Sequence, residues 1–207
     1  TSRRQRQMCI RDRDKLYILL MQDITKTFTI QWVGPFKNLQ KMKIYLKDET
    51  TCQNSLFNFY YFSGNKKGKG YSMSRVYSYF GIHKKLDGIE QRLNNWHSHY
   101  KDFHENDNMR IWIGAFGNVN DQNEENIEDA ETLFISTYGK NFLTENEKKV
   151  KANIQKSICI INLFYKTTEE PWLRKPADIS FMDDVLIHET EDKIKRTLVA
   201  KLKSIKW

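Results

Sequence analysis

Two tyrosine-rich segments and two charged residues carry the chemical groups that stand out in this sequence. Residues 58–61 read Asn-Phe-Tyr-Tyr, and residues 79–81 read Tyr-Phe-Gly. Arg92 and Glu131 come later, each beside an apolar repeat. A phenol can position or activate water, a guanidinium binds phosphate oxygens with a planar fork, and a carboxylate helps to hold Mg²⁺. Groups of these kinds are suited to chemistry at a phosphate.

The two tyrosine-rich segments are predicted to form the strands of a hairpin. Residues 55–62 (SLFNFYYF) and 75–82 (RVYSYFGI) have the aromatic content of buried strands, and a Gly/Lys-rich segment lies between them. Two strands joined by such a flexible turn favour a β-hairpin. Tyr79 and Gly81 then lie at the end of its second strand.

Helices are predicted to carry the two charged residues. Asp87 and Glu90 have the spacing of a capping box, and Arg92 lies at the edge of the apolar stripe that follows. A strand is predicted at 109–114, and Glu131 lies on the helix after it, beside the apolar face. That face comprises Ile127, Ala130, Phe134 and Tyr138.

The remaining segments continue the alternation of helix and strand. Thr144 with Glu147 predicts a short lysine-rich helix, and residues 157–164 predict another strand. A long C-terminal amphipathic helix is predicted from apolar residues at helical spacing, Ile194, Leu198, Leu202 and Ile205. The expected fold is one α+β domain with a small, mainly antiparallel β-sheet flanked by helices.

The order of these features resembles the GIY-YIG nuclease family. The resemblance covers about residues 56–150 and includes Asn58-Phe59-Tyr60 in one strand, residues 79–81 in the next, and Arg92 and Glu131 on successive helices. It implies a GIY-YIG endonuclease-like fold and a Mg²⁺-dependent endonuclease that hydrolyses DNA by direct attack of water. Such hydrolysis requires an activated water, stabilisation of the phosphorane, and relief of charge on the leaving oxygen.

The resemblance assigns four catalytic roles to positions of this chain. Tyr79 and either Tyr60 or Tyr61 are the strand tyrosines, which act as base or water positioner if neighbouring cations lower their pKa. Arg92 is the phosphate clamp. Glu131 is the ligand of Mg²⁺, or of another divalent cation such as Mn²⁺.

Two further roles fall on residues near the predicted helices. The family asparagine corresponds to Asn146, with Asn141 as the alternative, and His97 supplies a second proton-transfer group on the helix of Arg92. A zinc cluster of His97, His99 and His104 is a weaker hypothesis, because a His-x-His pair without a nearby cysteine is an incomplete ligand set.

DNA is the expected partner, and RNA stays an alternative. Gly81 is expected to let the substrate approach the backbone. Lysines of the hairpin loop are expected to contact phosphates of the nucleic acid. Many relatives have a lysine at the position of Ile82, and His83 or Lys84 is expected to take its place. The expected nucleic-acid contacts are Lys66, Lys67, Gly81, His83 and Lys84.

Two other functions stay open from the sequence. Asn58 stands where the family has a glycine, and Ile82 departs from the lysine, so a nucleic-acid-binding module that has lost cleavage is one alternative. The other is a protein-interaction domain, in which the aromatic hairpin is core and the C-terminal helix docks a partner.

The first 20 residues are expected to be a non-native or disordered leader, which leaves residues 21–207 as a single domain with a C-terminal strand and helix as an extension. Residues 1–13 (TSRRQRQMCIRDR) resemble translated sequencing-adapter read-through and contribute +4 of the net charge of +8. Met21 is the expected start of translation. The mildly basic remainder is compatible with a polyanionic partner.

Cysteine usage and hydropathy indicate a cytoplasmic protein without a membrane span. Cys52 and Cys159 have no CxxC spacing and form no framework typical of secreted domains. No apolar run approaches the ~20 residues that a spanning helix requires.

Overall fold

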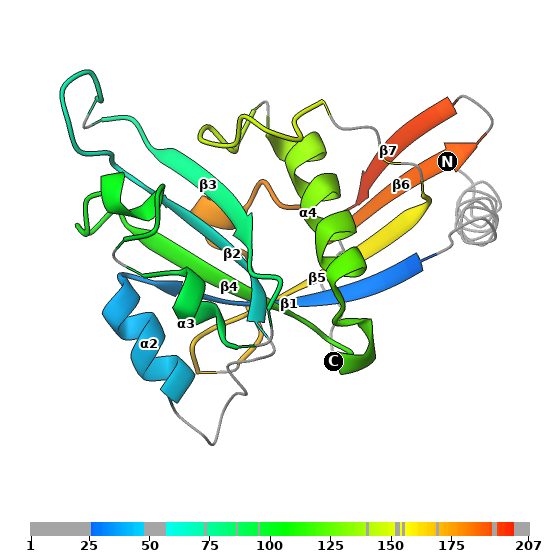
Figure 1. Ribbon diagram of the computed structural model, residues 1–207, viewed down its shortest axis with the longest axis horizontal. Coiled ribbons are helices and arrows are strands. Elements are labelled where there is room, and N and C mark those ends of the chain that lie inside the picture. Colours follow the sequence, from blue (N-terminus) through cyan, green and yellow to red (C-terminus); the bar gives the residue numbers. More distant parts are fainter. Residues whose placement is uncertain are drawn as a thin grey trace, which may run out of the picture.

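One mixed β-sheet organises the chain. The computed structural model describes residues 26–47, 57–72, 74–85, 87–94, 96–139, 141–151, 154, 156–168, 170–191 and 194–200. Seven strands form the sheet in the order β3-β2-β4-β1-β5-β6-β7 (Figure 1). The strands are β1 (Lys26–Phe36), β2 (Phe57–Gly64), β3 (Tyr77–Ile82), β4 (Arg110–Phe116), β5 (Ile158–Tyr165), β6 (Val185–Glu191) and β7 (Ile194–Ala200).

Three α-helices accompany the sheet in the described residues. They are α2 (Leu39–Lys47), α3 (Ile89–Arg92) and α4 (Glu124–Tyr138). Strands β1 and β5 run parallel, and every other neighbouring pair is antiparallel. The expected α+β class with a mainly antiparallel sheet is therefore confirmed, although the sheet is larger than the small one expected.

Helix α4 covers one face of the sheet (Figure 1). Asn123 caps it by accepting a hydrogen bond from the Asn126 backbone N–H. The predicted apolar stripe packs inward: the Phe134 ring lies 5.8 Å from that of Trp32 and 4.9 Å from that of Phe80. Because this stripe is buried, the polar edge of α4 that carries Glu131 is directed towards the margin of the sheet.

The opposite face carries α2 and α3, and the alternation of side chains along β2 separates two adjacent tyrosines. Phe59 and Tyr61 belong to the apolar cluster under α4. Tyr60 and Phe62 point to the other face and pack with residues of α2 and α3. Successive side chains of a strand point to opposite faces, so only one of the two tyrosines faces α3.

Helix α3 is much shorter than predicted. Gly88 precedes it and no side chain caps it, so the predicted capping box at Asp87 is wrong. The helix ends at Arg92, and Asn94 follows it: the Asn94 Oδ1 accepts from the Trp96 N–H, and its Nδ2 donates to the Gln91 carbonyl. Such side-chain bonds to the backbone compete with helical hydrogen bonds. Trp96 is exposed and does not continue an apolar stripe.

The helix predicted from Thr144 is also wrong. Residues 141–151 form turns beside β3. The Thr144 Oγ1 accepts from the Ser78 N–H, and the Glu145 N–H donates to the Ser78 carbonyl. The hydroxyl that would have capped a helix thus satisfies an edge strand.

The predicted C-terminal helix is wrong where the structure describes it. Residues Ile194–Ala200 form β7, which pairs antiparallel with β6. Thr197 and Val199 are β-branched and favour a strand, and β6 offers an edge of backbone groups for pairing. Leu202, Ile205 and the whole leader 1–20 lie outside the described residues. None of the helices in the described ranges has the length and apolar content to cross a membrane.

Candidate active site

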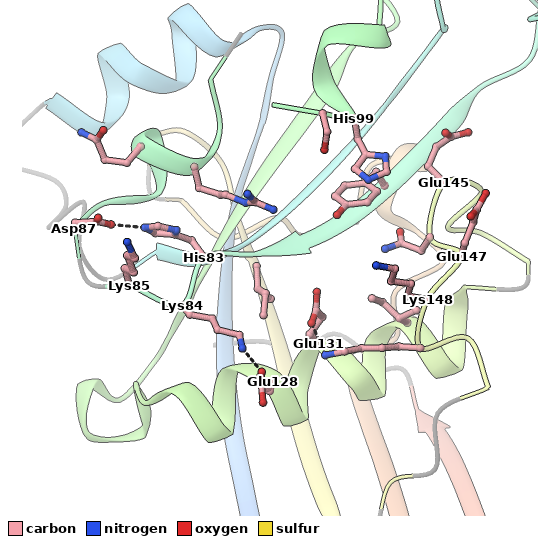
Figure 2. Close-up of a pocket in the computed structure, with 18 residues that line it drawn as sticks. His83, Lys84, Lys85, Asp87, His99, Glu128, Glu131, Glu145, Glu147 and Lys148 are labelled. Atoms are coloured by element: carbon pink, nitrogen blue, oxygen red, sulfur yellow. Dashed lines mark hydrogen bonds and ion pairs between the residues drawn. The ribbon is translucent and has the colours of Figure 1, made fainter. Parts of the chain in front are cut away.

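A pocket of about 930 Å³ lies beside the edge strand β3, between α3 and α4 (Figure 2). It brings together groups from distant parts of the chain. Residues predicted as functional that line it are Tyr79, His83, Lys84, Arg92, Glu131 and Asn146. Tyr60, Lys66, Lys67, Gly81 and His97 were predicted too, and they are not among the lining residues.

Tyr60 and His97 form a buried pair behind the pocket. The Tyr60 hydroxyl lies 2.8 Å from His97 Nε2. His97 Nδ1 accepts from the backbone N–H groups of His99 and Tyr100, each at 3.3 Å. In a neutral ring the proton is therefore on Nε2, which donates to Tyr60.

His97 is neutral at physiological pH. Burial lowers the pKa of this histidine to about 4, and the positive charge of Arg92 and the neighbouring His99 add to the shift. Burial raises the pKa of Tyr60 above its ordinary value. Both members of the pair are therefore uncharged, and their hydrogen bond fixes the orientation of the Tyr60 ring.

Tyr79 is the phenol that reaches the pocket. Its ring stacks on His99 with centroids 4.0 Å apart, and it lies 6.2 Å from the Tyr60 ring. Burial raises the pKa of Tyr79, and the negative charge of Glu131 raises it further, against the opposite effect of Arg92. Burial thus outweighs the cation, and Tyr79 is a protonated hydrogen-bond donor near neutral pH.

The geometry distinguishes Tyr60 from Tyr61. The Tyr61 hydroxyl donates to the Asp178 carbonyl on the α4 side of the sheet. Gly81 is paired with Tyr60 across the strands, and a Cβ added there would lie 2.4 Å from Tyr60 Cζ. The space left by the missing side chain of Gly81 is filled by the Tyr60 ring, so the expected role in substrate approach is not supported.

Asn146 holds the edge of β3 in place. Its Oδ1 accepts from the Phe80 N–H and its Nδ2 donates to the Phe80 carbonyl, both at 2.8 Å. This pair satisfies backbone groups that an edge strand leaves open. Asn141 is exposed and is not among the lining residues. Asn146 is therefore the asparagine of this pocket, and it acts as a positioning residue.

Asn58 is buried and supports the other end of β3. Its Nδ2 donates to the His83 carbonyl at 2.9 Å, and its Oδ1 accepts from Gln122 at 2.8 Å. His83 in turn contacts Asp87 through its ring (Figure 2). A glycine at position 58 would lack both side-chain bonds, so this asparagine is part of the local architecture.

Four acidic side chains of the pocket have basic partners. Glu131 Oε2 lies 2.6 Å from Lys149 Nζ. Figure 2 shows the pairs of Glu128 with Lys84 and of Asp87 with His83. Glu145 pairs with Lys66, which lies outside the pocket.

The remaining charges of the pocket are mostly positive. Within the described ranges, no ion pair is made by Arg92, Lys85 or Lys148, or by the acidic Glu147. Five lysine and arginine side chains and five aspartate and glutamate side chains line the pocket, so their formal charges balance. The unpaired cations Arg92, Lys85 and Lys148 are the groups that can bind an anionic ligand.

Two lysines predicted to contact phosphate lie elsewhere. Lys66 is buried, and its ammonium donates to Glu145 at 2.6 Å and to Tyr71 at 3.2 Å. The ammonium is thus engaged within the protein, which does not favour the expected contact with phosphate. Lys67 is exposed but lies outside the pocket.

Glu131 is the carboxylate that was predicted to bind a divalent cation. It points from α4 into the pocket in Figure 2, and its side chain is mostly buried. In the described part of the chain, no cluster of three His, Cys, Asp or Glu side chains has the geometry of a metal site. The hypothesis of a zinc cluster that includes His97, His99 and His104 therefore has no support.

Sequence reasoning named His99 only as a zinc ligand and gave Lys149 no role in the site. His99 stacks on Tyr79, and Lys149 pairs with Glu131. The alternation of His97 and His99 was the signal for the first. The second had none, because Lys149 was placed on a predicted helix that does not form.

The comparisons with known proteins gave no relative. No protein-family model matches the chain, no curated protein matches it, and no solved structure matches its fold. The pocket is therefore the feature that indicates a function.

Proposed function

We propose that this pocket is the active site of a Mg²⁺-dependent endonuclease of the GIY-YIG type that hydrolyses DNA phosphodiester bonds. The observation that carries the proposal is the meeting of Tyr79, Arg92 and Glu131, from β3, α3 and α4, in one pocket. A phenol, a guanidinium and a carboxylate around one space supply the three kinds of group that the reaction requires.

Arg92 binds the scissile phosphate in this proposal. Its side chain is exposed, lines the pocket and has no ion pair among the described residues. A guanidinium keeps its charge at any physiological pH and presents parallel N–H groups to phosphate oxygens. Lys85 and Lys148, which also make no ion pair with a described residue, add positive charge beside it.

Glu131 holds the divalent cation. Mg²⁺ retains several waters and is commonly bound through one or two carboxylates together with phosphate oxygens, so one acidic residue suits it. Mn²⁺ has similar oxygen ligands. When bound, the cation neutralises charge on the phosphate and lowers the pKa of coordinated water.

Tyr79 positions the attacking water. A protonated phenol is a poor nucleophile, which fits direct attack by water without a covalent intermediate. The His97–Tyr60 hydrogen bond and the stacking of His99 on Tyr79 hold the two tyrosine rings in one orientation. Preorganised groups of this kind need no rearrangement during the reaction.

A nucleic-acid-binding module without cleavage is the second candidate. The ion pair of Glu131 with Lys149 favours it, because the proposed cation ligand is neutralised by the protein itself. The protein-interaction domain has less support, since the segment from residue 194 to residue 200 is a strand and not a docking helix.

Nicking of supercoiled plasmid tests the proposal. We expect purified protein to nick plasmid with Mg²⁺ and not with EDTA, and Glu131→Gln or Arg92→Lys to reduce the rate by about 100-fold or more. Glu147→Gln is the matched control, because Glu147 lines the same pocket without an ion pair in the described ranges. Salt-sensitive DNA binding without nicking would support the binding module. If the protein neither nicks nor binds DNA, both candidate functions are excluded.

A further inference from the structure

Lys149 occupies an unusual position in the pocket. Its backbone has φ of +63°, and among the described residues it is the single non-glycine residue with a positive φ. This left-handed region is uncommon for a lysine, and a residue held there is stabilised by its surroundings. The Nζ atom donates to Glu131 Oε2 at 2.6 Å. The side chain is about one-third exposed, whereas that of Glu131 is 14% exposed.

The turn that carries Lys149 is anchored to β3. Asn146 bonds the Phe80 backbone in both directions, and the Glu145 N–H donates to the Ser78 carbonyl. These bonds hold the turn against the strand that carries Tyr79. The backbone of Lys149 is therefore held in place beside Glu131, while its flexible four-carbon side chain can adopt other rotamers.

An ammonium and a divalent cation compete for the same carboxylate. The Mg²⁺–oxygen distance is about 2.1 Å, so both cations at Glu131 would lie within a few ångströms of each other, and their repulsion is strong in a mostly buried site. Among the described residues, Glu131 accepts no hydrogen bond from a basic side chain other than Lys149. Repulsion between the two cations therefore opposes this bond when the divalent cation binds.

We infer that Lys149 is the internal counter-ion of Glu131 and is displaced when a divalent cation binds, so that it sets the cation affinity of the site. This inference rests on the proposed function for its cation, but it concerns the metal-free protein. Lys149 holds the carboxylate in place and neutralises it while no cation is bound. Released, the ammonium is free to pair with the phosphate that arrives with the cation.

Binding of Mn²⁺ to the protein without DNA tests the inference. Free Mn²⁺ is measured by its electron paramagnetic resonance signal during titration of the wild type, Lys149→Gln and Lys148→Gln. Lys148 is the matched control: it lines the same pocket with the same charge, and it has no ion pair in the described ranges. Both substitutions remove one positive charge, but only Lys149→Gln frees Glu131.

We expect Lys149→Gln to bind Mn²⁺ about tenfold more tightly than Lys148→Gln, because a hydrogen bond between two charged groups no longer has to be broken. Lys149→Arg should keep the weak wild-type affinity. Lys149→Gly, which suits a positive φ, guards against misfolding and should bind as tightly as Lys149→Gln. Glu131→Gln should lose the site in either background.

Equal affinities of the Lys149→Gln and Lys148→Gln variants would overturn the inference, as would an absence of Mn²⁺ binding in all variants. Failure of the proposed function is seen separately. If the wild type nicks plasmid and the two lysine variants bind Mn²⁺ equally, the inference fails and the nuclease stands. If Lys149→Gln binds Mn²⁺ more tightly but no variant nicks DNA, the counter-ion role stands and the nuclease fails.

Discussion

Two regions of the pocket are built from different interactions. The hydrogen-bonded wall consists of Tyr60, Gly81, His97 and Asn146, whose polar atoms are neutral and are paired with each other or with backbone. The ionic rim consists of Lys84 with Glu128 and Lys149 with Glu131, whose charges are paired across the pocket. The rim and Asn146 line the pocket, whereas Tyr60, Gly81 and His97 lie behind it, and the two regions differ in burial and in charge.

The difference indicates which groups are fixed and which can exchange partners. Leaving a buried polar group without its hydrogen bond costs about 1–3 kcal/mol, so we expect loss of a bond in the wall to lower the free energy of unfolding. The exposed pair of Lys84 with Glu128 contributes about 0–1 kcal/mol, and its members can turn to another charged group at little cost. We therefore expect the wall to set the position of Tyr79 and the rim to respond to the ligand.

The largest effect is expected from Gly81→Ala in the hydrogen-bonded wall. The added Cβ would lie 2.4 Å from Tyr60 Cζ, and the ring is fully buried. Overpacking of this kind lowers the free energy of unfolding by about 3 kcal/mol. Urea denaturation measures it. In a Tyr60→Leu background the same substitution should cost much less, and an undiminished cost would show that the contact is not the cause.

Acid should weaken the wall through His97. The pKa of this histidine is about 4 in the folded protein and 6.5 in its ordinary state, so between these values the unfolded chain binds a proton that the folded chain does not. The free energy of unfolding should therefore fall by at most ~3 kcal/mol as pH drops from 6.5 to about 4. Above pH 6.5, titration of His97 should not change it.

A comparison with His97→Gln isolates this effect from the titration of carboxylates. Gln cannot be protonated, so the difference between the two stability curves should change across pH 4 to 6.5. Curves that remain parallel over that range would contradict a buried neutral histidine.

Asn146→Ala should cost about 2 kcal/mol, because it removes two hydrogen bonds to the Phe80 backbone. Hydrogen exchange should then increase at the β3 edge more than in α4. Asn141→Ala is the control, since Asn141 is exposed, and it should leave both measurements unchanged. Equal effects of the two substitutions would contradict a positioning role of Asn146.

The smallest effect is expected in the ionic rim. Lys84→Ala breaks the pair with Glu128, whose members are both more than one-third exposed. Its cost in urea denaturation should be below about 1 kcal/mol and should shrink further in high salt. A loss as large as that of Asn146→Ala would mean that the rim is structural, and the contrast between the two regions would disappear.

Local patterns were sufficient to predict the parts of the fold that carry the pocket. The aromatic content of β2 and β3, and the helical stripe of α4 with Ala130 and Phe134 buried, follow from periodicity that tertiary contacts reinforce. Tyr79, Arg92 and Glu131 therefore came from the correct neighbourhoods of the chain, although their meeting in one pocket depended on the resemblance.

Other features could not be predicted because tertiary contacts override local signals. Thr144 has the spacing of a helix cap, yet its hydroxyl is bonded to β3. Residues 194–200 have a helical apolar spacing, yet pairing with β6 makes them a strand. The contact of Lys149 with Glu131 depends on a turn with positive φ, for which the lysine gives no signal.

The central claim is that Arg92 and Glu131 act on one scissile phosphate, and a double-mutant cycle of plasmid nicking tests it most directly. The rates of Arg92→Lys, Glu131→Gln and the double variant are measured under saturating Mg²⁺. Residues that act as a unit are non-additive, so the double variant should be about as slow as the slower single variant. A double variant that is slower by the product of the two single effects would contradict a shared phosphate.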